Sequence, residues 1–263
     1  MSPHILVSVE QVTPQLLANL TTQQVGLELS YFANPVHLEA ANLNEQIAYH
    51  KTLLQDFNLP KTMHGAFYDL NPVARDARII EVCYFRVNQS LEIAAQLGMK
   101  KVVFHTNYIH SNYSDYKKVW IDKQVAFWTK LKPTLESLGI SIYLENTSEE
   151  NATYINTIVE LLDSPHIAVC YDTGHSHCFT NSKISPVEWV KVYGNKLGYV
   201  HLHSNHGAFD EHIAFTKGTV NFEGFFEAFM AIDPLPYLII EVKKSEDYHI
   251  SLAALREMFA SKF

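Results

Sequence analysis

Short apolar runs alternate with longer segments of helical periodicity along the whole chain. Runs of this length, bounded by turn-forming residues, are typical of buried strands. The apolar pattern predicts strands over residues 5–9, 25–29, 62–67, 102–105, 140–145, 167–171, 198–203 and 237–242.

The segments between these runs carry helix signals. Apolar residues recur at a spacing of about 3.6, Thr13-Pro14 has the form of a helix start, and Gly98 and Gly139 have the form of helix ends. The pattern predicts a first helix that begins at residue 13. It predicts further helices over residues 44–57, 75–97, 115–138, 151–162, 185–192, 222–230 and 248–259.

Eight strand-helix units follow one another without a Gly-, Ser- or Pro-rich linker. Strands that alternate with helices form parallel sheets, and eight such units in about 250 residues match a closed (β/α)8 barrel. We therefore predict an α/β fold, a single TIM-barrel domain over residues 1–263. A doubly wound open sheet is the alternative, and its Rossmann form is disfavoured because no G-x-G-x-x-G follows the first strand.

Composition narrows the class of protein. The chain is 47% hydrophobic, enough for a sizeable core, and its formal net charge of -8 argues against a nucleic-acid partner. Its three cysteines lack a C-x-x-C motif, which argues against a disulfide scaffold or a thiolate zinc site. Without a signal-like N-terminus or an apolar run near the roughly 20 residues of a membrane span, we expect a cytoplasmic protein with no membrane partner.

Six consecutive predicted strands end in side chains of the types that can bind metals. Active sites of (β/α)8 barrels lie at the carboxyl ends of the strands, so these side chains should meet at one rim. They are His64, His105, Glu145, Asp172 with His175, His201 with Asp210 and His212, and Glu241.

Each of these residues has an ordinary explanation when taken alone, because a single histidine at a strand end is more often a hydrogen-bonding residue than a ligand. Six such coincidences after strongly apolar strands are harder to explain, since buried charged groups are costly unless paired or metal-bound. The mixed imidazole and carboxylate set suits zinc or manganese, or cobalt or iron, better than magnesium.

Other residues near the strand ends are candidates for contact with a substrate. His203 shares the inward face of its strand with His201 and would orient a ligand or contact the substrate. Phe67 and Tyr68 follow His64 and would wall a small pocket. Lys217 follows the histidine-rich loop and would contact an anionic group, although a solvated turn lysine is the simpler reading.

Several motifs between His64 and Glu241 resemble, in order, those of the xylose isomerase-like TIM barrels. They read H-G-A-F-Y-D-L-N-P, V-V-F-H-T, L-E-N-T, Y-D-T-G-H and H-L-H-S-N-H-G-A-F-D-E-H. That superfamily contains sugar and sugar-phosphate isomerases and epimerases, and also the endonuclease IV family. The first branch implies one metal held by Glu145, Asp172, His201 and Glu241. The second implies three zinc ions held by nine ligands, which adds His64, His105, His175, Asp210 and His212.

The resemblance and the acidic charge together favour a metal-dependent isomerase or epimerase of a small sugar or sugar phosphate. It would act through a metal-stabilised enediolate, with Glu145 and Glu241 exchanging the proton and His175 binding a substrate oxygen or a second metal. Some ketose epimerases carry an Arg after the seventh-strand His. This chain reads S-N-H-G there, so we do not expect the substrate contact that such an Arg would make. The alternatives are a multi-zinc phosphodiesterase acting on abasic-site DNA and a barrel that only binds a ligand.

Overall fold

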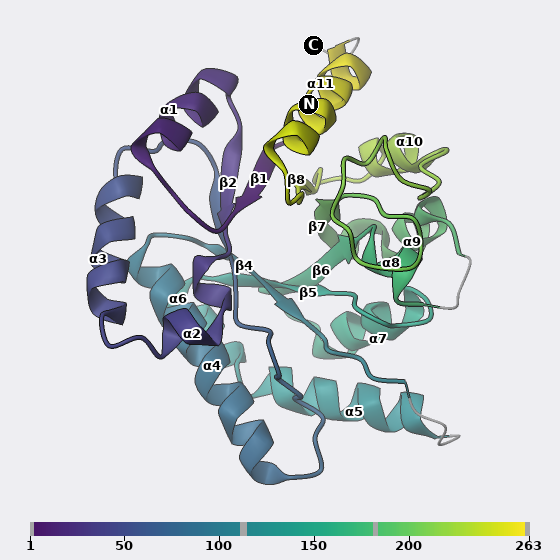
Figure 1. Ribbon diagram of the computed structural model, residues 1–263. Coiled ribbons are helices and arrows are strands. Elements are labelled where there is room, and N and C mark those ends of the chain that lie inside the picture. The colour runs from purple at the N-terminus through teal and green to yellow at the C-terminus, as the bar shows by residue number, and fades with distance from the viewer. Residues whose placement is uncertain (1–2, 111–114, 181–183, 261–263) are drawn as a thin grey trace.

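Eight parallel strands close into a barrel in the computed structural model, which describes residues 3–110, 115–180 and 184–260 (Figure 1). Each strand pairs with the next in the chain, and β8 pairs with β1 through Leu6 and Ile239. The strands are β1 (Ile5–Val9), β2 (Gly26–Leu29), β3 (Lys61–His64), β4 (Lys101–His105), β5 (Ser141–Glu145), β6 (Ile167–Asp172), β7 (Leu197–Leu202) and β8 (Tyr237–Ile240). The predicted (β/α)8 barrel is confirmed, and the open sheet is excluded.

Figure 1 shows the helices arranged around the outside of the strands. The α-helices are α1 (Pro14–Gln23), α2 (Pro35–Leu38), α3 (Leu43–Leu54), α4 (Ala77–Gln96), α5 (Tyr116–Thr129), α6 (Lys132–Leu138), α7 (Thr153–Leu162), α8 (His175–Cys178), α9 (Pro186–Tyr193), α10 (Phe225–Met230) and α11 (Ser245–Ala260). Two 3₁₀ turns, η1 (Tyr31–Ala33) and η2 (Gly194–Lys196), complete the described elements. Within the described ranges, no helix has the length and apolar character needed to cross a membrane.

The predicted helix over residues 115–138 is wrong in one respect, because the structure divides it into α5 and α6. Pro133 lies in the first turn of α6. A proline lacks the backbone N–H of a helix and its ring clashes with the carbonyl four residues earlier, here that of Thr129, where α5 ends. The proline therefore sets the break between α5 and α6.

The predicted strand over residues 62–67 is too long, because β3 ends at His64. Gly65 still donates its backbone N–H to Val103 O at 2.8 Å, and the Phe104 ring occupies the space where a Cβ of Gly65 would stand. Beyond this point the chain leaves the sheet and carries Phe67 into the region above the barrel.

Apolar side chains pack on both sides of the strands. The larger group fills the space between the barrel and the helices. A smaller group fills the barrel interior and consists of Leu6, Val103, Tyr143, Cys170, Tyr199 and Ile239. Because side chains alternate along a strand, the next inward position lies two residues further toward the carboxyl end. On five strands that position is held by His105, Glu145, Asp172, His201 and Glu241, so the apolar group forms a floor beneath a polar site.

Candidate metal centre

Four side chains from the ends of β5, β6, β7 and β8 converge on one point. Glu145, Asp172, His201 and Glu241 each offer a ligand atom, and these atoms all lie within 4.8 Å of one another. The Nδ1 atom of His201 is 3.0 Å from Glu145 Oε1, 3.2 Å from Glu241 Oε2 and 3.8 Å from Asp172 Oδ2. The predicted four-residue set is thus brought together, while its role as a ligand set stays a prediction.

This arrangement fits a divalent cation better than it fits hydrogen bonding alone. One imidazole nitrogen carries at most one hydrogen, so His201 Nδ1 can satisfy only one of the three carboxylates around it. The buried Glu241 Oε2 has no hydrogen-bond partner among the described residues. Like charges held together in a low-dielectric interior repel one another, and a divalent ion would neutralise them. The nitrogen and oxygen donors match the preferences of zinc and manganese.

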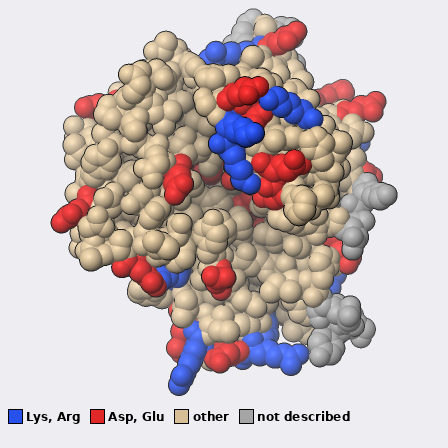
Figure 2. All heavy atoms as spheres, in the orientation of Figure 1, with Lys and Arg blue, Asp and Glu red and all other residues tan. Residues whose placement is uncertain are grey.

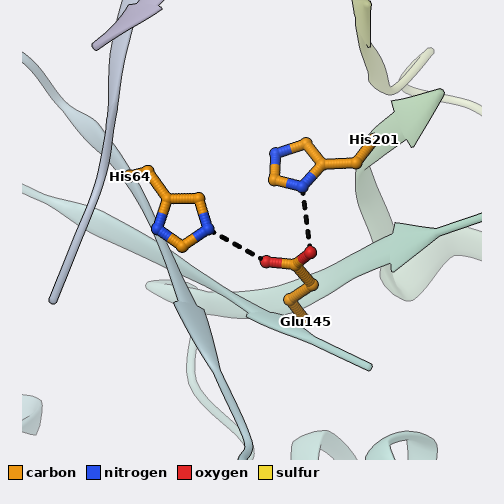
Figure 3. Close-up of side chains that lie close together, drawn as sticks. All are labelled: His64, Glu145 and His201. Atoms are coloured by element: carbon orange, nitrogen blue, oxygen red, sulfur yellow. Dashed lines mark hydrogen bonds and ion pairs between the residues drawn. The ribbon is translucent and has the colours of Figure 1, made fainter. Parts of the chain in front are cut away.

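Two further histidines flank Glu145. His201 contacts Glu145 Oε1, whereas His64 Nε2 and His105 Nε2 each lie 3.2 Å from Glu145 Oε2. Figure 3 shows His64 and His201 on either side of this carboxylate. Burial alone would raise the pKa of Glu145, but the imidazoles of His105 and His201 hold it well below its usual range. Glu145 is therefore a carboxylate at neutral pH.

We call Glu145, Asp172, His201 and Glu241 the first cluster. A second cluster lies beside it and consists of His175, Asp210 and His212. Asp210 Oδ2 is 2.6 Å from His212 Nε2 and 3.5 Å from His175 Nε2. His212 has a φ of 51°, a left-handed backbone conformation that a non-glycine residue seldom adopts. The buried Asp210 Oδ1 lacks a hydrogen-bond partner within the described part of the chain. The two clusters, together with His64 and His105, account for all nine residues predicted for a multinuclear site.

His203 lies behind the first cluster. Its ring is fully buried, with Nε2 3.0 Å from Asp172 Oδ2, and it stacks on the His212 ring at 4.0 Å between centroids. His203 thus contacts Asp172, and together with His212 and Glu241 it also forms a group that could hold a metal ion. It lies outside the described lining of the cavity, so its predicted contact with substrate gains no support from the geometry.

A cavity of about 390 Å³ opens next to the two clusters. Its lining includes Phe67, His105, Asn107, Thr147, His175 and Phe179. The Phe67 ring stacks on the His105 ring at 4.2 Å, and Tyr68 stacks on Phe67 while remaining half exposed. Phe67 therefore lines the cavity, whereas Tyr68 lies outside its described lining and stacks on Phe67, and contact of either ring with a substrate stays a prediction.

Lys217 lies away from this cavity. Its Nζ is 2.9 Å from Asp247 Oδ1 and 3.2 Å from Glu246 Oε1, at the start of α11. These two carboxylates already neutralise the lysine, which weakens its predicted contact with an anionic substrate group. Lys243 is also engaged, donating to Asp210 O at 2.8 Å. Figure 2 shows basic and acidic side chains gathered together beside a hollow near the centre of this face.

The sequence reasoning missed two buried carboxyl groups. Glu28, on β2, is fully buried and contacts His201 Nε2 at 3.2 Å. Glu149, four residues after the end of β5, is fully buried next to Thr106 and Thr147. The available signal for Glu28 was a charged residue inside the apolar run G-L-E-L. For Glu149 there was no comparable signal, because an acidic residue after a strand is ordinarily exposed.

The model of the xylose isomerase-like TIM barrel family matches residues 26–258, and the chain belongs to this family. Among curated proteins, it is 28% identical to the uncharacterized protein MJ1614 of Methanocaldococcus jannaschii, over 82% of this chain and 84% of that protein. The protein MJ1311 of the same organism is also 28% identical, over 81% of this chain and 74% of that protein.

Solved structures share the whole fold at low sequence identity. The TTHB071 protein from Thermus thermophilus, soaked with ZnCl2, superposes with a TM-score of 0.78 at 19% identity and covers 98% of both chains. A D-tagatose 3-epimerase-like protein gives 0.77 at 24% identity, over 98% of this chain and 99% of that one. A D-psicose 3-epimerase in the presence of D-fructose gives 0.76 at 14% identity, over 97% and 98%.

Proposed function

We propose that the protein is a metal-dependent isomerase or epimerase of a small sugar. The observation that carries the proposal is the convergence of Glu145, Asp172, His201 and Glu241 beside a cavity of about 390 Å³. A cavity of this size suits a small ligand. Proteins of similar structure, which include a D-psicose 3-epimerase and the 3-keto-D-glucoside 4-epimerase from E. coli, support the same reaction class.

The lining of the cavity favours an unphosphorylated sugar. Asn107 and Thr147 offer polar groups for hydroxyls, and Phe67 and Phe179 offer apolar walls for C–H groups. Among the described lining residues there is no Lys or Arg, the side chains that usually bind a phosphate. A phosphorylated sugar would bring its charge next to Asp69 and the carboxylates of the clusters instead.

In this proposal Glu145, Asp172, His201 and Glu241 hold the metal, and the two glutamates also move the proton. A bound divalent metal would supply Lewis acidity that makes the C–H next to the substrate carbonyl more acidic. Glu145 and Glu241 reach the site from β5 and from just beyond β8, so they approach a substrate carbon from different strands. One glutamate, as the carboxylate, would remove the proton to give an enediolate, and the other, entering the step as the protonated acid, would give its proton to that carbon or to its neighbour. His175 lines the cavity and would hydrogen-bond a substrate oxygen.

The test is exchange of solvent protons into a sugar. The metal-loaded protein is incubated with D-fructose, D-tagatose and D-psicose in D2O, and deuterium at carbon is followed by NMR. We expect exchange with at least one sugar and its loss in Glu145→Gln and Glu241→Gln, by more than about 100-fold. Glu257→Gln, on the exposed side of α11, is the matched control and should exchange as the wild type does. Undiminished exchange in both site variants would refute the acid-base roles.

A second candidate function rests on the second cluster. His175, Asp210 and His212, with His64 and His105 on the far oxygen of Glu145, would give a multinuclear zinc site suited to phosphodiester hydrolysis. Metal content separates the two functions. One metal per chain agrees with the sugar reaction, whereas three zinc ions together with cleavage of abasic-site DNA would establish the phosphodiesterase.

A further inference from the structure

Glu28 is a charged residue inside the barrel, on a strand for which the sequence predicted no site residue. It occupies an inward position on β2, in register with Ser8 of β1 and Thr62 of β3, and is fully buried. Burying a carboxylate costs several kcal/mol unless a partner compensates for the loss of water. The strand around it is apolar and buried throughout, so packing of β2 does not explain a glutamate at this position.

The partner of Glu28 is His201, the one imidazole of the first cluster. Glu28 reaches across the barrel interior to β7, where His201 Nε2 lies 3.2 Å from each of its carboxylate oxygens. Tyr199, two residues earlier on the inward face of β7, donates its hydroxyl to Glu28 Oε2 at 2.7 Å. Thr62 Oγ1 lies 2.5 Å from the same hydroxyl and fixes its direction.

The two nitrogens of His201 therefore face different groups. Nε2 faces Glu28, while Nδ1 faces Glu145, Asp172 and Glu241. A ring nitrogen that donates a hydrogen bond on one side leaves the other nitrogen to act as a metal ligand. Without an acceptor at Nε2, the carboxylates around Nδ1 would compete with the metal by accepting a hydrogen from that nitrogen.

We propose that Glu28 is a positioning residue that accepts the Nε2–H of His201 and so holds the ring with Nδ1 directed at the metal site. This inference rests on metal binding by the first cluster in the proposed function. It also assigns β2 a part in the site, although the sequence predicted no site residue on this strand. Tyr199 and Thr62 support Glu28 and act on the metal only through it.

Two substitutions separate hydrogen bonding from charge. Glu28→Met removes the acceptor and fills a similar volume with an apolar side chain. Glu28→Gln keeps a carbonyl oxygen for Nε2–H, and its amide can donate to the Tyr199 oxygen while the Tyr199 hydroxyl turns to Thr62. Tyr199→Phe is the matched control, because it removes the supporting hydroxyl and leaves the contact between Glu28 and His201.

Zinc and manganese affinities are measured by competition with a chelator, and imidazole N–H groups by 1H–15N spectra of histidine-labelled protein with and without zinc. We expect Glu28→Met to weaken metal binding by about 10- to 100-fold and to lose the hydrogen-bonded Nε2–H signal of His201. Glu28→Gln should keep the signal and lose less affinity than Glu28→Met, and Tyr199→Phe should lose least.

Wild-type affinity in Glu28→Met, or a wild-type spectrum without a proton on Nε2, would overturn the inference while leaving the proposed function intact. If the wild type bound no metal, the proposed function would fail, and the spectrum of the metal-free protein would still decide whether Glu28 holds His201. If Glu28→Met failed to fold, the decision would rest on whether the wild type shows the hydrogen-bonded Nε2–H signal of His201 and whether Glu28→Gln keeps it.

Discussion

Glu149 is a carboxyl group that the fold keeps away from water beside the site. Its Oε2 accepts the Thr147 backbone N–H at 2.6 Å, and its Oε1 lies against the Thr106 hydroxyl. That hydroxyl has one hydrogen and also lies 3.1 Å from Glu145 O. A protonated Glu149 can donate to Thr106, which then donates to Glu145 O, so the neutral form satisfies every group. Burial raises the pKa of Glu149 to about 7.

This pKa predicts how Glu149 affects stability. Because the folded state raises the pKa from its ordinary value of 4.5 to about 7, the folded state holds the proton more tightly. The contribution of Glu149 is therefore full below pH 4.5 and is lost as the pH rises through 7. The wild type should lose this contribution as the pH rises from about 5 to 8, whereas Glu149→Gln should not. The unfolding free energy of Glu149→Gln should therefore rise relative to that of the wild type by up to about 3 kcal/mol over this range. Urea unfolding at several pH values measures this, and a pH-independent difference would contradict it.

At the level of residues, the sequence predicted those site residues that stand where a strand ends in an imidazole or carboxylate. It missed buried acidic residues at other positions. His64, Glu145 and His201 follow apolar runs, so the barrel rule brings them together. Glu28 precedes the last residue of its strand, and only the register of β2 shows that Glu28 is the inward side chain. Contacts across the barrel interior, such as that between Glu28 and Tyr199, depend on three-dimensional distance and leave no trace in local pattern.

At the level of elements, prediction succeeded where a period repeats and failed where it does not. Helices such as α4 and α7 contain several turns, enough for the 3.6-residue pattern to show. The short helices α2 and α8 have four residues each, too few for periodicity to reveal, and they went unpredicted. α8 nevertheless carries His175, so the site depends on a connection that only the structure describes.

The loop between β6 and α8 is packed against the end of β7 with no room for a side chain. A Cβ on Gly174 would lie 2.0 Å from His203 Cε1, while the φ of -78° is ordinary for any residue. Gly174→Ala must therefore displace the His203 ring, which contacts Asp172 and stacks on His212. We expect a loss of about 1–3 kcal/mol in unfolding free energy together with weaker metal binding.

Gly98→Ala provides the comparison for this substitution. Gly98 has a φ of 70° and nothing within 4 Å of an added Cβ, so alanine would strain the backbone without a collision. It should lose about 1 kcal/mol of stability and keep the metal affinity of the wild type. Equal effects of the two substitutions on metal affinity would show that His203 does not position the site.

At the level of the whole molecule, the barrel gathers acidic groups together with imidazoles that offset part of their charge. Glu28, Glu145, Asp172, Asp210 and Glu241 lie in or near the interior of a chain whose net charge is already -8. Each comes from a different strand or the loop after it, so the complete site exists only when the barrel is closed. A metal bound there stabilises the folded state and has no equivalent site in the unfolded chain.

Removing the metal should therefore lower the thermal stability of the whole barrel. At a free metal concentration about 1,000 times the dissociation constant, binding adds about 4 kcal/mol, which corresponds to roughly 10 °C in Tm for a chain of this size. Thermal unfolding of chelator-treated protein, before and after titration with zinc or manganese, measures this, and elemental analysis gives the number of ions. Asp172→Asn combined with His201→Ala should abolish the shift for one ion at the first cluster, while His175→Ala combined with His212→Ala should preserve it. A shift lost only in the second pair would place the metal at the second cluster and favour phosphodiester chemistry.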